Sequence, residues 1–373
     1  MSTSAGRPRS PVVDQIMASI AQEQRLKKKL SQRVAGSVAL FRRRNPDADP
    51  HEKARGFIEN IDWRLPEDLA DLGSTAREFP DLVSSSTSRL LDQSAVFIAA
   101  YLSICGYVLG AAGTRWRQRG RPWRKVDVLA GLLQRSMTAT NETFALLQRG
   151  FPDGAEARMR TVVELAIIAK FIEDNNVEIT ERYKASHYVE MWRRKEDGHI
   201  RGLTDTLSKT IDKQYERTIQ RFGSSMSRPY GWASPAFDNR RVTFADISRA
   251  YGDLDSDSRF SNASHHVHAT HSGTLKSAFA DTDSVFLHGP RPLGFFLPAC
   301  DCLDSIQQCA EAFLRAVMSS RHNVEVVYWA ELLHYAMREA QLEIIRAQAS
   351  IKPEWAIDLM EPLTYLESDD FCP

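Results

Sequence analysis

Residues Ala157–Asp174 read ARMRTVVELAIIAKFIED, and this stretch decides the fold. On a helical wheel of 100° per residue, the positions within about 60° of Glu164 are mostly apolar. They are Ala157, Arg160, Ile167, Ile168 and Phe171. Arg160 and Glu164 therefore lie inside the apolar stripe, where an unpaired carboxylate is costly. We expect a core helix whose Arg160 pairs with Glu164 one turn away, either to fix the packing of a bundle or to serve a site.

Helical periodicity extends over most of the chain, and no run of period-two alternation stands out. Residues 1–62 read as a basic amphipathic helical extension, and residues 63–85 as a linker broken by Pro66, Gly73 and Pro80. Residues 86–373 read as a helical bundle. The pattern predicts helices at 86–118, 125–149, 154–175, 177–222, 299–320, 324–349 and 353–366, with a loop at 224–241 and a capping-box start at Thr243–Asp246. We therefore expect an all-α fold, an irregular multi-helix bundle with a basic N-terminal helical extension.

Composition excludes several classes of protein. The chain has 373 residues, 43% of them hydrophobic and 26% charged, which is typical of a globular protein and not of a disordered one. The five cysteines are odd in number and scattered, so reduced thiols and a cytoplasmic location are expected instead of a disulfide framework. The sequence contains no P-loop, GxGxxG or HExxH motif.

The uncharged stretch VFIAAYLSICGYVLGAAG, Val96–Gly113, allows two interpretations. It reaches the minimum length of a membrane-spanning helix and is followed by a basic segment. Its glycines, tyrosines and serine make it only moderately apolar, as in a buried bundle helix. We favour the bundle helix, with membrane association as the alternative.

The stretch RFSNASHHVHATHSG, Arg259–Gly273, holds four of the ten histidines of the chain. A metal site would use His265, His268 and His271, but three residues at i, i+3 and i+6 wrap too far round a helix to converge easily. We therefore expect no metal and no cofactor. If the stretch is helical, Ser264, His268 and His271 share one face.

A histidine that titrates near neutral pH, together with an arginine that holds phosphate, can cleave RNA through its own 2′-hydroxyl without a metal. Arg259 precedes His265 and His266 at the spacing Arg-x(4–6)-His, the loose signature of HEPN-type helical ribonucleases. Arg193 and His199 have the same spacing.

Several segments together resemble one family. LLQRGFPDGAEARMRTVVEL, Leu146–Leu165, is followed by ERYKASHYVEMWRRKE, Glu181–Glu196, with its Arg182–Tyr183 pair, then by Trp232, and then by SHHVHAT, which has the form Ser-x-x-Val-His. This order resembles a bacterial helical family catalogued as domain of unknown function 5677, over roughly residues 125–320. The resemblance implies that Arg160, Glu164, Ser264 and His268 are the matching positions. Similar helical proteins often occur in bacterial defence and toxin–antitoxin loci, which favours an RNA-directed effector.

The sequence therefore leads to two hypotheses. The first is a metal-independent, HEPN-like RNA-cleaving effector of a defence or toxin–antitoxin system. Its site residues are His268, His265, His266, Arg259, Glu164, Arg160 and Ser264: the histidines act as acid or base, Arg259 or Arg160 holds phosphate, and Glu164 orients its neighbour. RNA, an antitoxin or defence-system partner, and a second copy in a homodimer are the expected partners. The second hypothesis is a non-catalytic helical module that binds a protein or a ligand.

Overall fold

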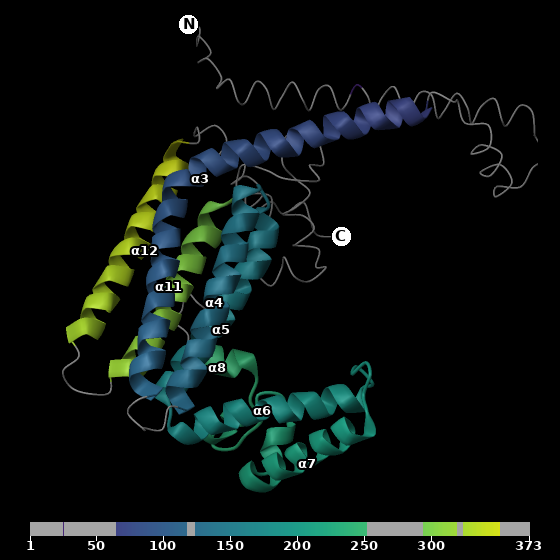
Figure 1. Ribbon diagram of the computed structural model, residues 1–373, viewed down its shortest axis with the longest axis vertical. Helices are drawn as coiled ribbons and strands as arrows, with labels where there is room; N and C mark the ends of the chain where they lie inside the picture. Colours follow the sequence, from purple (N-terminus) through teal and green to yellow (C-terminus); the bar gives the residue numbers. More distant parts are fainter. Residues whose placement is uncertain (1–24, 26–64, 118–123, 252–293, 319–323, 351–373) are drawn as a thin grey trace, which may run out of the picture. The chain divides into compact units, whose positions relative to one another are not determined.

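The computed structural model describes residues 65–117, 124–251, 294–318 and 324–350, together with Arg25 (Figure 1). Within these residues the regular structure is helical throughout, which confirms the predicted all-α multi-helix fold. The elements are α3 (Leu65–Arg117), α4 (Arg124–Gln148), α5 (Pro152–Asp174), α6 (Val177–Glu196), α7 (Asp205–Phe222), the 3₁₀ helices η1 (Ser224–Ser227) and η2 (Gly231–Phe237), α8 (Phe244–Tyr251), α11 (Phe296–Met318) and α12 (Val324–Ser350). The predicted basic extension, residues 1–62, lies outside the described residues apart from Arg25.

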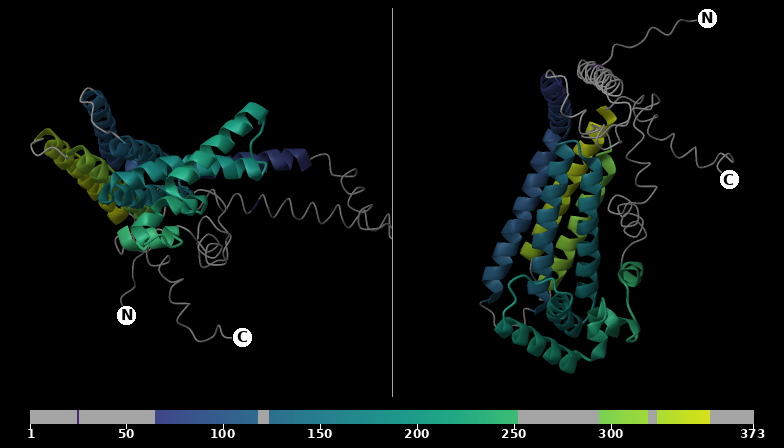
Figure 2. Two further views of the ribbon diagram at one scale, coloured as in Figure 1. Left: turned by 90° about the horizontal axis from the view of Figure 1, so that it is seen from below. Right: turned by 90° about the vertical axis from the view of Figure 1, so that its right-hand side faces the viewer.

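The chain divides into two compact units, and Leu65–Leu90 belongs to the first. In the second unit α4, α5, α11 and α12 run side by side with the part of α3 that follows Leu90 (Figures 1 and 2). α5 packs closely against α11, and most of its residues between Met159 and Ile172 are buried. The sequence pattern explains this, because a helix whose apolar side chains extend nearly all round its axis is stable only when other helices surround it.

Polar side chains join the helices of this bundle inside its core. The Tyr101 hydroxyl on α3 donates to Gln307 Oε1 on α11 over 3.0 Å. The Cys302 thiol on α11 contacts Thr140 Oγ1 on α4 over 3.5 Å. Burial raises the pKa of Cys302 and of Cys309 to about 12, so both remain uncharged thiols near neutral pH and neither serves as a thiolate nucleophile.

The helix α3 passes through residues that the sequence predicted as a linker. The structure has helix from Leu65 onward, across Gly73 and Pro80. Pro66 is compatible with this because it stands in the first turn, where a backbone N–H has no partner within the helix, and one glycine costs a helix only about 1 kcal/mol. We have no physical account of Pro80 in the helix interior. The predicted domain boundaries themselves remain a prediction.

Within α3, the segment Thr87–Gly110 is long and apolar enough, by length and composition, to cross a membrane. In the structure Ile98, Tyr101 and Cys105 on one of its faces are buried in the bundle. Val96 and Tyr107 are exposed. The buried face fits the interpretation as a bundle helix, and membrane association remains a prediction.

The sequence predicted one helix over 177–222, and this was wrong. α6 ends at Glu196 and α7 begins at Asp205, with Gly198 and Gly202 at φ +70° and +68° between them. These left-handed conformations stop a helix and suit glycine, which has no Cβ. The Thr204 hydroxyl then accepts from the backbone N–H of Leu207 over 3.2 Å and starts α7. α6 and α7 therefore form a helical hairpin.

The predicted capping-box start of α8 is confirmed. Both the backbone N–H and the hydroxyl of Thr243 donate to Asp246 Oδ2, over 2.9 and 2.7 Å, and the Asp246 N–H donates back to Thr243 Oγ1 over 3.3 Å. Arg240 forms an ion pair with the same carboxylate. These hydrogen bonds, chiefly those from Thr243, lower the pKa of Asp246 to about 2.

Asp246 should therefore stabilise the folded chain above pH 4 and lose that effect as the pH falls towards 2. The pKa of Asp246 in the folded chain, about 2, is below its ordinary value of 3.8, so in this window the unfolded chain binds the extra proton. The variant Asp246→Asn lacks the carboxylate at every pH. We expect the melting temperatures of wild type and variant, measured from pH 6 to pH 2, to differ most above pH 4 and to converge towards pH 2. A gap that stays constant or widens on acidification would contradict this role.

Candidate functional site

Arg182 on α6 fastens the loop that follows α7. Its guanidinium donates to Phe222 O over 2.8 Å, to Ser225 Oγ over 2.9 Å, and to Gly231 O and Trp232 O over 3.3 Å each. Arg182 is only 3% exposed and its bonds to Gly231 O and Trp232 O are buried, so water does not readily replace those two bonds. The bonds reach 40 to 50 residues along the chain, and they fix η1 and η2 against α6.

The loop can close in this way only with a glycine at position 231. A Cβ on Gly231 would lie 1.9 Å from the backbone oxygen of Ser225. The residue before it, Tyr230, has φ +54° and ψ +17°, a left-handed conformation that is unusual for a bulky side chain. Such strain often occurs at functional sites and here is held by the contacts of the loop.

Aromatic side chains join this loop to the core helix α5. Trp232 is buried and meets the rings of Phe171 on α5 and Tyr183 on α6 edge to face, with centroids 5.3 and 4.8 Å apart. Phe171 also packs edge to face against Tyr251 at the end of α8, with centroids 4.7 Å apart. The loop, α6 and α8 are thus positioned around one face of α5.

The polar cluster, which we define as Arg160, Glu164, Tyr183, Glu190 and Tyr230, is built on this frame. Burial raises the pKa of Tyr183 to about 12, with further contributions from the carboxylates of Glu190 and Glu164. Burial also raises the pKa of Tyr230, Glu164 raises it further, and Arg160 lowers it. Glu164 therefore acts electrostatically on both phenols, and both remain protonated near neutral pH.

The chemistry of the polar cluster follows from these groups. Arg160 supplies a permanent cation with a planar set of donors that suits phosphate or carboxylate. The two phenols supply hydroxyl donors, and Glu164 supplies an acceptor. Arg160 and Glu164 are half-buried, as expected for polar side chains inside an apolar stripe. The predicted Arg160–Glu164 ion pair itself remains a prediction.

The other predicted site residues, Arg259, Ser264, His265, His266 and His268, lie outside the described residues. The described residues on either side of this segment nevertheless lie against opposite ends of α5. Before it, the Tyr251 hydroxyl accepts from Asn175 Nδ2 over 3.1 Å, at the C-terminal end of α5. After it, a Cβ on Gly294 would lie 3.4 Å from Cβ of Pro152, the first residue of α5. Tyr251, the last described residue before the histidines, and Gly294, the first described residue after them, therefore lie at opposite ends of the helix that carries Arg160 and Glu164.

The second Arg-x(4–6)-His pair does not form a site of this kind. His199 is exposed beyond the end of α6, and Arg193 donates to the backbone oxygen of Ser227. Among the described residues, no three His, Cys, Asp or Glu side chains gather as metal ligands would.

Sequence reasoning missed Tyr183 and Tyr230 as members of the site. In the sequence Tyr183 stands out only as the neighbour of Arg182, the arginine that fixes the loop. Tyr230 precedes Gly231 in the sequence PYGW, and a tyrosine before a glycine in a loop gives no sign of a left-handed backbone.

One comparison with known proteins found a match. Residues 126–285 match the model of a family described as "Family of unknown function (DUF5677)", which confirms the predicted resemblance over this range. The matched range contains α5 to α8, and therefore all of the polar cluster. No curated protein and no solved structure matches the chain. The likeness to HEPN-type ribonucleases remains a prediction.

Proposed function

We propose that this chain is a metal-independent RNA-cleaving effector whose site is built on the face of α5 that carries Arg160 and Glu164. The observation that supports this most is that Arg160 and Glu164 lie half-buried on α5, where Glu164 acts electrostatically on the protonated phenols of Tyr183 and Tyr230. Arg160 would hold a phosphate of the RNA backbone, and the phenols would donate hydrogen bonds to it.

The acid–base groups of the proposal come from the histidines of residues 259–271. A neutral histidine takes the proton of the 2′-hydroxyl as its oxygen attacks phosphorus, and a protonated group gives a proton to the departing 5′-oxygen. The P–O5′ bond breaks as the P–O2′ bond forms, so the products are a 2′,3′-cyclic phosphate and a 5′-hydroxyl. Arg160 or Arg259 offsets the charge that develops on the phosphoryl oxygens. The positions of Tyr251 and Gly294, the described residues on either side of the histidines in the sequence, against the two ends of α5 support the assignment.

A non-catalytic binding module is the second candidate, and a different observation favours it. Arg182 and Trp232, which belong to the family resemblance, make contacts that fix the loop and do not point to a reaction. The polar cluster could hold an anionic ligand by the same hydrogen bonds without transforming it.

A cleavage assay decides between these candidates. Purified full-length protein is incubated with total RNA and with tRNA, with and without EDTA. The same assay is run on His268→Ala, Arg259→Ala and Glu164→Gln. We expect cleavage that persists in EDTA and falls about 100-fold or more in His268→Ala, because general acid–base catalysis contributes on this scale.

His199→Ala is the matched control, because His199 is exposed beyond α6 and should be dispensable. Each variant is first shown to melt at the wild-type temperature, and if His268→Ala does not, His265→Ala and His266→Ala replace it. Intact RNA in every reaction would contradict the proposal and leave the binding module. Cleavage abolished by EDTA would contradict metal independence.

A further inference from the structure

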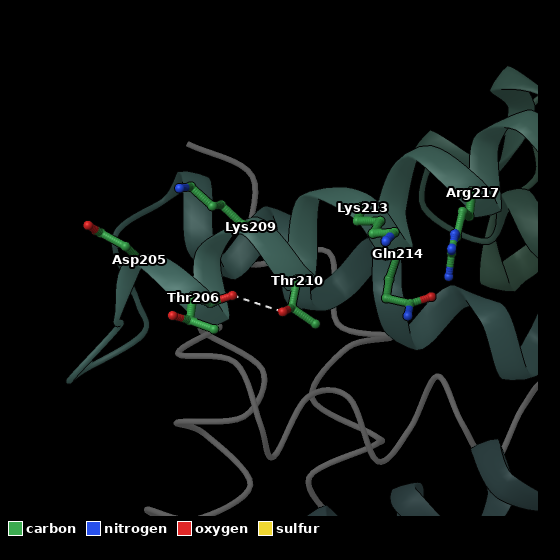
Figure 3. A pocket seen from close by; sticks show the side chains of 7 residues that line it. All are labelled: Asp205, Thr206, Lys209, Thr210, Lys213, Gln214 and Arg217. Carbon is green, nitrogen blue, oxygen red and sulfur yellow. Dashed lines mark hydrogen bonds between the residues drawn. The ribbon is translucent and has the colours of Figure 1, made fainter.

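The outward face of α7 carries cations at regular spacing. Lys209, Lys213 and Arg217 are exposed and follow one another every four residues, which places them about 6 Å apart along the helix axis. Together with Asp205, Thr206, Thr210 and Gln214 on the same helix, they line an open surface hollow, and Figure 3 labels these side chains. We call Lys209, Lys213 and Arg217 the cationic track.

Nearby acidic groups offset this charge only in part. Asp212, one turn from Lys209 on α7, forms an ion pair with Lys195 on α6, so its charge is already partly neutralised. Asp205 lies at the N-terminal end of the hollow. Glu216 is exposed, and by helical spacing it shares the face of Lys209. The three cations of the track thus outnumber the two carboxylates of Asp205 and Glu216, and the hollow keeps a small positive balance.

We propose that the cationic track binds the phosphate backbone of single-stranded RNA. The inference rests on the proposed function for its choice of RNA, and it concerns a different surface from the polar cluster. Proteins that bind single strands without reading their sequence use positively charged surfaces that follow the backbone. A flexible strand can set successive phosphates against cations spaced in this way, and Arg217 can bind a phosphate with two parallel hydrogen bonds.

The composition of the hollow favours a nucleic acid over an acidic protein segment. Among the described residues that line it, none has an apolar side chain. Protein interfaces depend on a few buried aromatic or aliphatic anchors, which this surface does not offer. Binding to a phosphate backbone depends on cations and the release of counterions, which this surface does offer.

The test measures binding to a labelled 2′-O-methyl oligouridylate by fluorescence anisotropy at several salt concentrations. This probe lacks the 2′-hydroxyl that the proposed cleavage needs, so it cannot be consumed. In Lys209→Gln/Lys213→Gln/Arg217→Gln, the negative slope of log K against log salt should become less steep by about 2, because each of three lost phosphate contacts contributes about −0.7. At 0.1 M salt this corresponds to an affinity loss of about 100-fold.

The control Arg315→Gln/Arg338→Gln/Arg346→Gln removes the same charge from exposed positions on α11 and α12 and should bind as wild type does. Glu216→Gln should bind more tightly than wild type, an effect that loss of folding could not produce. The inference is overturned if the track variant keeps the wild-type affinity and slope, or if the control loses as much as the track variant. It is also overturned if wild type does not bind the probe, or if a poly-glutamate peptide competes better than RNA.

The two proposals can fail separately. If the probe binds through the cationic track but natural RNA is not cleaved, the RNA-binding proposal stands and the ribonuclease proposal is refuted. Cleavage of natural RNA by wild type, with an unchanged affinity of the track variant for the probe, would refute the track alone.

Discussion

Replacing Arg182 with alanine is expected to lower the free energy of unfolding by about 3 kcal/mol or more. The substitution removes the donor from buried hydrogen bonds to Gly231 O and Trp232 O and from part-buried ones to Phe222 O and Ser225 Oγ. Each buried acceptor that loses its donor costs about 1–3 kcal/mol, although such costs are not additive. The loop would then release Trp232 from its contacts with Phe171 and Tyr183.

The measurement is urea unfolding followed by near-ultraviolet circular dichroism, which reports the packing of the tryptophans. Arg221→Ala is the matched control, because Arg221 is an exposed arginine that pairs with Glu181 and should contribute about 1 kcal/mol or less. Equal effects of the two substitutions would show that Arg182 does not fasten the loop.

Gly231→Ala is expected to cost about 3 kcal/mol, through overpacking and not through a lost contact. The new Cβ would meet the backbone oxygen of Ser225 at 1.9 Å and its carbonyl carbon at 2.8 Å. Neither atom belongs to a flexible side chain, so η1 and η2 must separate, and the position of Tyr230 relative to Arg160 and Glu164 would change.

Gly131→Ala supplies the opposite expectation. Gly131 lies on the exposed side of α4, and a Cβ there meets nothing within 4 Å. Alanine should therefore stabilise that helix by about 0.5–1 kcal/mol. The melting temperatures of Gly231→Ala and Gly131→Ala test these two expectations: the first should be lower than that of wild type and the second slightly higher. If Gly231→Ala melts at or above the wild-type temperature, the close approach of η1 and η2 is wrong.

The sequence predicts the helical core well because periodicity is a local property. The wheel centred on Glu164 places α5 inside the bundle, and α5 is indeed buried along most of its length. The same wheel identifies Arg160 and Glu164 as polar side chains in an apolar stripe, and the structure has both half-buried. The cap formed by Thr243 and Asp246 is equally local, since both partners lie within one turn.

What the sequence does not predict depends on contacts over long distances along the chain. Arg182 reaches acceptors 40 to 50 residues away, and no periodicity encodes such a partner. The left-handed backbone of Tyr230 follows from those contacts and not from its own preference, which disfavours it. The break between α6 and α7 was foreseeable, because Gly198 and Gly202 lie close together in a polar stretch.

The most direct test of the ribonuclease proposal is to identify the ends of the RNA fragments that the full-length protein produces in the presence of EDTA. Attack by the 2′-hydroxyl must leave a 2′,3′-cyclic phosphate on one fragment and a 5′-hydroxyl on the other. Mass spectrometry of a short oligoribonucleotide distinguishes these ends from those of water-mediated cleavage. We predict cyclic phosphate from wild type and none from a folded His268→Ala variant. Fragments that carry 5′-phosphate and 3′-hydroxyl ends, or an oligoribonucleotide that remains intact, would contradict the proposal.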